Sequence, residues 1–101
     1  MTTAPALEPL WPSQHIQAVA LASELQRMGF KTVVFKKDGH LFHPCVWVAC
    51  GDREEFIYVA PDDDDRWWFW WSSLVPIALM AEINVTADSV SRRLALPLRR
   101  R

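Results

Sequence analysis

The chain has 101 residues, and half of them are hydrophobic, which is enough for one modest core in a single domain. Its 11 Lys and Arg residues nearly balance its 12 Asp and Glu residues, which argues against a general nucleic-acid-binding protein. Aromatic residues make up 12% of the chain, a share that excludes a disordered protein. We therefore expect one domain at residues 13–96, between a flexible arm at 1–12 and a basic mobile tail at 97–101.

A first helix is predicted over residues 14–28. Ser13 offers an N-cap hydroxyl, and Gly29 followed by Phe30 is typical of a Schellman ending. At 100° per residue, one stripe of this helix is apolar and is expected to pack on a sheet. The stripe consists of Ala18, Leu21, Ala22, Leu25 and Met28. Ile16 and Val19 lie outside it and are candidates for contact with the N-terminal arm or a second subunit.

A β-hairpin is predicted next, because residues 31–37 are rich in β-branched and aromatic residues and Asp38-Gly39 follows them. A two-residue turn there places Phe35 opposite Phe42. The first face of the sheet then carries Val33, Phe35, Phe42, Val46 and Val48. The second face then carries Thr32, Val34, Leu41, His43, Cys45 and Trp47.

Two more strands are expected to extend this sheet. Gly51-Asp52 predicts a second turn of two or four residues, and residues 55–60 predict a third strand. Either turn length places Ile57 and Val59 on the first face. Phe56 and Tyr58 then join Trp47 on the second face. A run of four aspartates leads into a fourth strand at residues 67–71, whose face assignment stays open because the loop length is unknown.

The C-terminal part is expected to be helical. A short helical stretch is predicted through Leu74, Ala78 and Met80, and a last helix is predicted over residues 87–96 with Thr86 as its N-cap. Val90 and Leu94 share one face of that helix. The predicted fold is therefore α+β, in the order α-β-β-β-β-α, with a four-stranded antiparallel meander and helices at both ends.

The second sheet face holds more large rings than two short helices can cover. Burying three rings of ~150–250 Å² each, at ~25 cal/mol per Å², contributes on the order of 10 kcal/mol. That is comparable to the net stability of a whole domain. We therefore expect a second copy of the chain, or a ligand pocket, at these rings. The residues predicted for this interface or pocket are Trp47, Phe56, Tyr58, Trp67, Trp68, Trp70 and Trp71.

The four aspartates are predicted to form an exposed loop that contacts a partner with a basic surface. This loop consists of Asp62, Asp63, Asp64 and Asp65. It does not follow the EF-hand pattern, because its sixth position is Trp67 and not glycine. The acids also surround the tryptophans with negative charge, so nucleic acid and anionic membranes are unfavourable partners.

Metal binding and catalysis are not expected. His43 and Cys45 point the same way on one strand, but His40 and Cys50 belong to the other face by parity. No further group would orient a Cys–His nucleophile. The two thiols would lie about 16 Å apart, outside disulfide reach. We therefore predict no cofactor, no metal and no enzymatic activity, and a cytoplasmic location for a chain with no secretory signal or transmembrane run.

The segment from Tyr58 to Trp71 reads YVAPDDDDRWWFWW. It resembles small uncharacterised actinobacterial proteins in which an Ala-Pro-Asp-Asp turn leads into a Trp-Trp-Phe-Trp-Trp strand. The resemblance covers residues 13–96 and implies an accessory protein that accompanies helix-turn-helix regulators. The order of elements is also similar to type III secretion chaperone-like domains, which implies a dimer that binds peptide segments.

These patterns predict a non-enzymatic protein–protein interaction or regulatory accessory module that acts as a homodimer. The alternative is a small-ligand-binding domain with an aromatic pocket beside the sheet.

Overall fold

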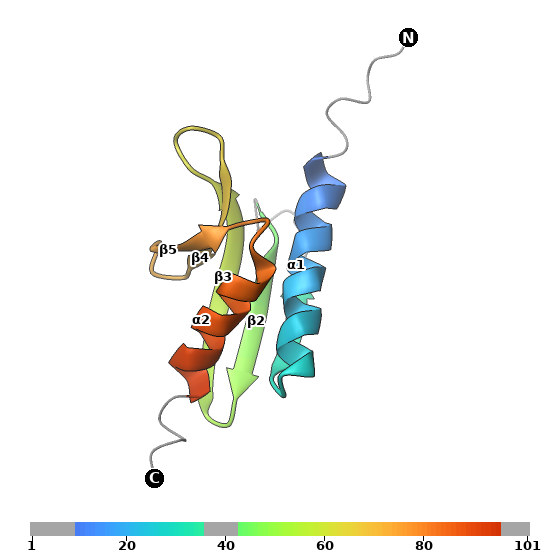
Figure 1. Cartoon of the computed structure of the whole chain (residues 1–101), viewed down its shortest axis with the longest axis vertical. Helices are drawn as coiled ribbons and strands as arrows, with labels where there is room; N and C mark the ends of the chain where they lie inside the picture. Colours follow the sequence, from blue (N-terminus) through green and yellow to red (C-terminus); the bar gives the residue numbers. More distant parts are fainter. Residues whose placement is uncertain (1–9, 36–42, 96–101) are drawn as a thin grey trace.

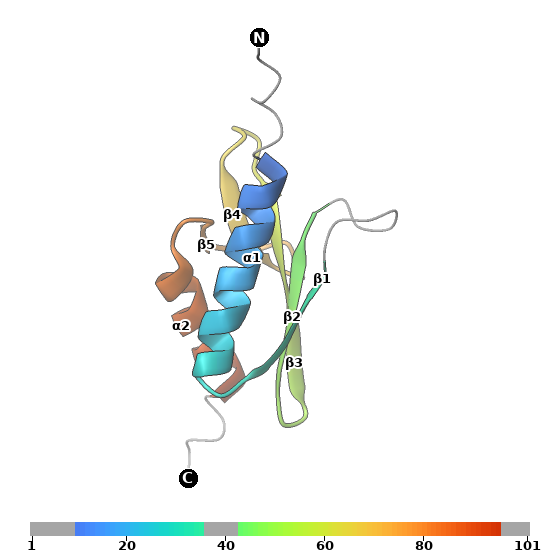
Figure 2. The ribbon, with the colours of Figure 1, turned by 90° about the vertical axis from the view of Figure 1, so that its right-hand side faces the viewer.

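A computed structural model describes residues 10–35 and 43–95 of the chain. It has an α+β fold with one antiparallel sheet, whose strands lie in chain order from β1 to β5. The elements are α1 (Leu10–Arg27), β1 (Lys31–Phe35), β2 (Cys45–Cys50), β3 (Arg53–Pro61), β4 (Trp67–Trp71), β5 (Pro76–Leu79) and α2 (Ile83–Ala95). Both helices lie against one face of the sheet (Figures 1 and 2). In the described ranges, the opposite face carries no helix.

Helix α1 begins at Leu10, inside the predicted flexible arm and before the predicted start at Gln14. Its C-terminal end confirms the predicted Schellman motif. The N–H of Phe30 donates to the carbonyl of Leu25 at 3.0 Å, and the N–H of Gly29 donates to that of Gln26 at 2.9 Å. Gly29 adopts a φ of +106°, a conformation that glycine reaches without a steric penalty.

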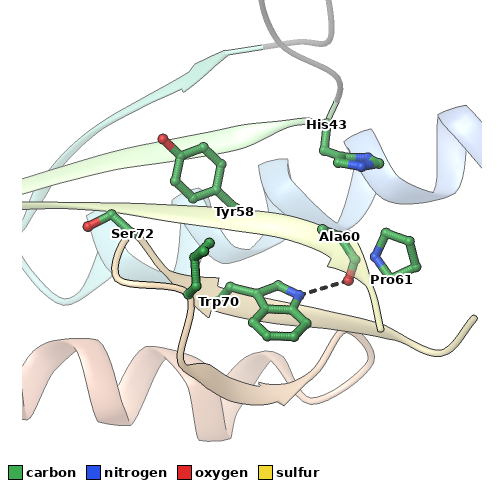
Figure 3. Close-up of a pocket in the computed structure, with 7 residues that line it drawn as sticks. His43, Tyr58, Ala60, Pro61, Trp70 and Ser72 are labelled. Carbon is green, nitrogen blue, oxygen red and sulfur yellow. Dashed lines mark hydrogen bonds between the residues drawn. The ribbon is translucent and has the colours of Figure 1, made fainter. Parts of the chain in front are cut away.

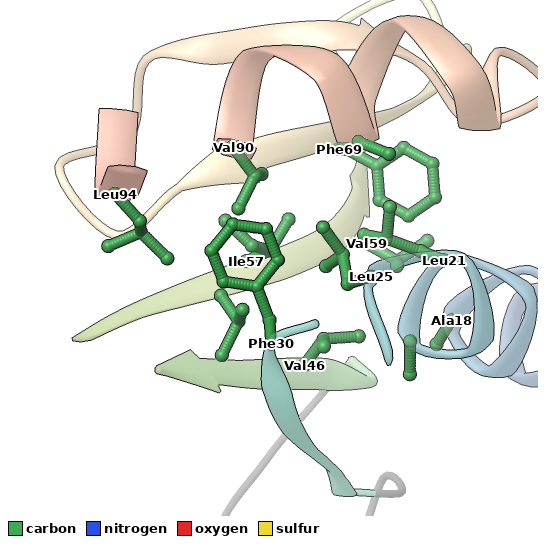
Figure 4. Packing of buried hydrophobic residues seen from close by; sticks show 13 residues of the cluster. Ala18, Leu21, Leu25, Phe30, Val46, Ile57, Val59, Phe69, Val90 and Leu94 are labelled. Carbon is green, nitrogen blue, oxygen red and sulfur yellow. The ribbon is translucent and has the colours of Figure 1, made fainter. Parts of the chain in front are cut away.

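The core lies between the two helices and the sheet face that they cover (Figure 4). The predicted helix stripe is buried there except for Met28, whose side chain is 41% exposed at the end of α1. Val90 and Leu94 are buried on α2, as predicted. The core cluster consists of Ala18, Leu21, Ala22, Leu25, Phe30, Val46, Val48, Ile57, Val59, Phe69, Ala87, Val90 and Leu94.

The predicted register between the first two strands is wrong. Phe35 pairs with Cys45 and not with Phe42, so the pairing differs by three residues. An odd shift moves each side chain of one strand to the other face. Val33 and Phe35 therefore lie opposite the helices, and Thr32 and Val34 lie on the helix side.

Pro44 gives the physical reason for this register. The predicted pairing runs the second strand from His40 through Pro44, but proline has no N–H to donate to a ladder. In the structure Pro44 is buried directly before β2, and its carbonyl accepts the N–H of Val59 at 3.1 Å. The Asp38-Gly39 turn, His40, Leu41 and Phe42 lie outside the described residues, as do residues 1–9 and the predicted tail at 97–101.

The middle of the sheet follows the prediction. Cys50 pairs with Arg53 across a two-residue turn, in which Gly51 has a φ of +62°. Val46 pairs with Ile57, and Trp47 pairs with Phe56. The assignment of the third strand to its two faces is therefore confirmed, as is a fourth strand at residues 67–71.

The predicted short helix after the fourth strand is wrong, because residues 76–79 form a fifth strand, β5. Trp68 pairs with Leu79, and Phe69 pairs with Ala78. The free edge of β4 offers these residues backbone hydrogen bonds, and such pairing outweighs a weak helical propensity. Pro76 is compatible with this position because β5 is an edge strand.

Helix α2 begins at Ile83, about one turn before the predicted start at residue 87. Thr86 is therefore inside the helix and is not its N-cap. Its hydroxyl donates to the carbonyl of Glu82 at 3.0 Å. A threonine hydroxyl satisfied in this way within a helix tolerates complete burial, and Thr86 is 0% exposed.

Candidate functional site

The register of β3 and β4 divides the tryptophan-rich strand between two faces. Trp71 pairs with Ile57, and Trp70 pairs with Tyr58. Trp67 and Trp71 therefore lie on the helix side, where both pack against the core. Their prediction as interface or pocket residues together with the other rings is corrected, because only Trp68 and Trp70 of this strand lie on the opposite face.

Trp67 and Trp71 each contact another side chain of the chain. The guanidinium of Arg93 lies 4.3 Å from the centre of the Trp71 ring and pairs with Glu55 at 3.1 Å. Trp67 meets the ring of His43 edge-on, with centroids 5.5 Å apart. Both tryptophan side chains therefore have packing partners within the chain.

We call the sheet face away from the helices the outer face. The strand pairing places eight large apolar or aromatic side chains on it, from all five strands. Phe35 and Phe56 are 42% and 37% exposed there. The pairing also places the charged Lys31 and Glu54 and the smaller Cys45, Ala49, Ala60 and Pro76 on this face. The eight large side chains are Val33, Phe35, Trp47, Phe56, Tyr58, Trp68, Trp70 and Leu79.

The three indoles of the outer face donate their N–H groups within the chain. Trp47 donates to the Glu54 carboxylate at 2.7 Å, and Trp68 donates to the Asp62 carboxylate at 2.8 Å. Trp70 donates to the carbonyl of Ala60 at 2.9 Å. These bonds fix the ring orientations and leave mainly carbon surface for contact with another molecule.

A pocket of about 470 Å³ opens on the outer face beside Trp70 (Figure 3). The rings of His43 and Tyr58 lie on one side of it in this view, and Trp70 lies on the other. Ser72 and Leu74 add walls from the turn between β4 and β5, and the end of β3 completes the lining.

Sequence reasoning did not identify Ser72 and Leu74 as site residues, because it placed Leu74 in a short helix for which Ser72 or Ser73 was the N-cap. Leu74 has a φ of +72°, which is rare for any residue except glycine, and its side chain is 75% exposed. No local sequence pattern predicts a leucine with a left-handed backbone conformation. The only sequence signal at this turn is the uncharged run of two serines before Leu74.

The aspartate loop is built around Asp62. Its carboxylate accepts the N–H groups of Asp64 at 2.8 Å and Arg66 at 3.0 Å, besides the Trp68 indole. Asp62 is therefore half-buried and internally bonded, which corrects its prediction as part of an exposed contact. Asp63, Asp64 and Asp65 are exposed, as predicted.

Asp62→Asn is expected to lower the melting temperature at pH 7. The hydrogen bond from the Arg66 backbone N–H is the main cause that lowers the pKa of Asp62, and the Trp68 and Asp64 N–H bonds act in the same direction. A lowered pKa stabilises the folded state above the unfolded-state value of about 4, and this contribution is lost as the pH falls through the folded value.

Thermal unfolding followed between pH 7 and about pH 2 checks this prediction. The difference between the wild type and Asp62→Asn should shrink in acid, whereas Asp63→Asn, on an exposed side chain of the same loop, should match the wild type throughout. Equal effects of the two substitutions would contradict the role of Asp62.

The cysteines of β2 are free thiols. Cys45 is buried, and burial raises the pKa of its thiol to about 11. Within residues 10–35 and 43–95, no cluster of three or more His, Cys, Asp or Glu side chains could hold a metal ion. Neither of the two described helices is both long and apolar enough to span a bilayer.

Comparison with protein-family models, with curated proteins and with solved structures finds no match for this chain. The resemblances stated for the Tyr58–Trp71 segment and for the order of elements therefore stay predictions.

Proposed function

We propose that this chain is a non-enzymatic protein–protein interaction module that acts as a homodimer through its outer face. The observation that carries the proposal is the outer face itself, which presents apolar side chains away from both helices. Its indole N–H groups are already bonded within the chain. The large side chains of this face therefore present mainly carbon surface, which favours an apolar partner over a polar one.

The size of the outer face supports a second copy as its partner. At about 150–250 Å² for each large ring, the exposed fractions of these side chains amount to several hundred Å². Monomers seldom expose a larger apolar patch than about 300–600 Å². Two such faces with their rims approach the lower end of specific interfaces, about 1,200 Å² in total. The net charge of −1 gives two copies little mutual repulsion.

The exposed aspartates favour a second contact, with a protein that presents a basic surface. Asp63, Asp64 and Asp65 project from a loop that Asp62 holds in place. Charged side chains at the edge of an interface mainly affect the rate of association and its dependence on salt concentration. We place this activity in the cytoplasm, where two unpaired thiols are compatible with the reducing environment.

Sedimentation velocity over a concentration series tests the dimer. Phe56→Lys, at the centre of the outer face, is expected to weaken self-association by about 30-fold or more, as for an interface hot spot. The matched control is Val85→Lys, on α2, where the side chain is 50% exposed on the other side of the molecule. A wild-type protein that stays monomeric up to about 100 µM, a weak dissociation constant for a dimer, would overturn the proposal.

A second candidate function is the binding of a small ligand. The pocket bounded by His43, Tyr58 and Trp70 favours it, because its volume lies within the usual range for small-molecule sites, about 300–1,000 Å³. Titration of the monomeric Phe56→Lys protein with small aromatic compounds separates this candidate from self-association.

A further inference from the structure

We infer that the pocket beside Trp70 takes a small, uncharged, planar aromatic compound that packs against the rings of Trp70 and Tyr58. The inference rests on the second candidate function and gives its ligand class. Tyr58 and Trp70 are direct cross-strand partners on the outer face, and both residues line the pocket. Figure 3 shows these rings, with the ring of His43, around the open space. Aromatic rings in such a position favour a flat ligand.

The hydrogen-bonding groups of the lining indicate a ligand with few polar atoms. The Trp70 indole already donates to the carbonyl of Ala60 at 2.9 Å, so the ring offers its carbon surface. Tyr58 and Ser72 are lining residues that carry a hydroxyl, a group that can donate or accept a hydrogen bond. One N–H or hydroxyl on the ligand is sufficient to meet one of them.

Charge at and near the pocket disfavours an ionised ligand. Apart from the imidazole of His43, the described residues that line it carry no acidic or basic side chain. A buried charge without a partner of opposite sign is costly, which disfavours cations and anions alike. The aspartate loop follows Pro61, a lining residue at the end of β3, and further disfavours anions.

Leu74 is the positioning residue of this site. Its left-handed backbone carries a steric cost for a leucine, and its side chain is 75% exposed although it is apolar. The turn that holds it is closed by two hydrogen bonds. The N–H of Leu74 donates to the carbonyl of Trp71 at 2.8 Å, and the N–H of Trp71 donates to that of Val75 at 2.9 Å. A ligand in the pocket would cover this side chain and offset its exposure.

The test titrates the ¹⁵N-labelled full chain that carries Phe56→Lys, so that a dimer does not cover the pocket, with indole, followed by the indole N–H resonance of Trp70. The further variants are made in this Phe56→Lys protein and compared with it. Tryptamine and indole-3-acetate serve as cationic and anionic probes with the same ring. We expect indole to shift the Trp70 resonance saturably below about 1 mM, and each charged probe to bind about tenfold more weakly. Leu74→Gly, which keeps the left-handed turn without strain, should weaken indole binding about fivefold or more.

Val75→Ala is the matched control, because Val75 is 53% exposed on the same turn but does not line the pocket. Its indole affinity should equal that of the Phe56→Lys protein. The inference is overturned if indole leaves the Trp70 resonance of the folded Phe56→Lys protein unchanged. It is equally overturned if a charged probe binds as tightly as indole, or if Leu74→Gly and Val75→Ala bind alike. Sedimentation of the wild type without indole reports on the dimer separately, so failure of one proposal is not mistaken for failure of the other.

Discussion

Phe69→Ala is expected to lower the free energy of unfolding by about 3–5 kcal/mol, as for other large-to-small changes in a core. Phe69 is 0% exposed and lies in the middle of β4, opposite Val59. It belongs to the cluster in which both helices meet the sheet (Figure 4). Removing the ring leaves a cavity that β4 cannot close alone, because β3 and β5 hold its backbone on both sides.

Urea denaturation measures this loss, and Phe56→Ala is the matched control. Phe56 is also a sheet phenylalanine, but it lies on the outer face and is 37% exposed. We expect Phe56→Ala to lower the free energy of unfolding of the monomer by clearly less. Equal losses for both substitutions would contradict the assignment of the helix side as the core.

Raising the pH from about 9 to 11 is expected to lower the free energy of unfolding by about 2 kcal/mol through Cys45 alone. Burial raises the pKa of this thiol from 9.0 to about 11. In this range the unfolded chain loses the thiol proton while the folded chain keeps it. The unfolded state therefore binds fewer protons than the folded state, so the stabilisation present below pH 9 is lost as the pH rises towards 11.

Denaturation of the wild type and of Cys45→Ala at several pH values checks the effect. The variant is less stable at pH 8 but should lose less stability between pH 9 and 11. Cys50→Ala, on the other thiol of the same strand, controls for alkaline titration elsewhere. If the stability of Cys45→Ala falls as steeply with pH as that of the wild type, then the Cys45 thiol is not the cause.

Short-range patterns in the sequence were sufficient for several elements. The end of α1 depends on Gly29 and Phe30, which follow the helix directly and satisfy its last carbonyls. The turn at residues 51–52 and the alternation of β3 are equally local, and both are confirmed. The amphipathic stripe of α1 is another local property, since it depends only on the helical period.

The faces of Phe35 and of the tryptophans in β4 could be decided only by the tertiary structure. Side chains in a strand alternate between the two faces of the sheet. One residue more or less in the aspartate loop would therefore exchange the faces of Trp68 and Trp71, and this loop has no standard length. The hydrogen bonds of Asp62 to Arg66 and Trp68 set that length. Similarly, the burial of Pro44 against β3 moved Phe35 to the outer face.

The sequence by itself determined the α+β class and the element ends that a glycine marks, at Gly29 and Gly51. It also showed that the chain has more large aromatic rings than two short helices can cover. The tertiary structure decided the fifth strand, the left-handed turn at Leu74 and the pocket that this turn borders. Each of these features depends on hydrogen bonds between backbone groups of different segments. Such pairing produces no periodic pattern of residues in the sequence.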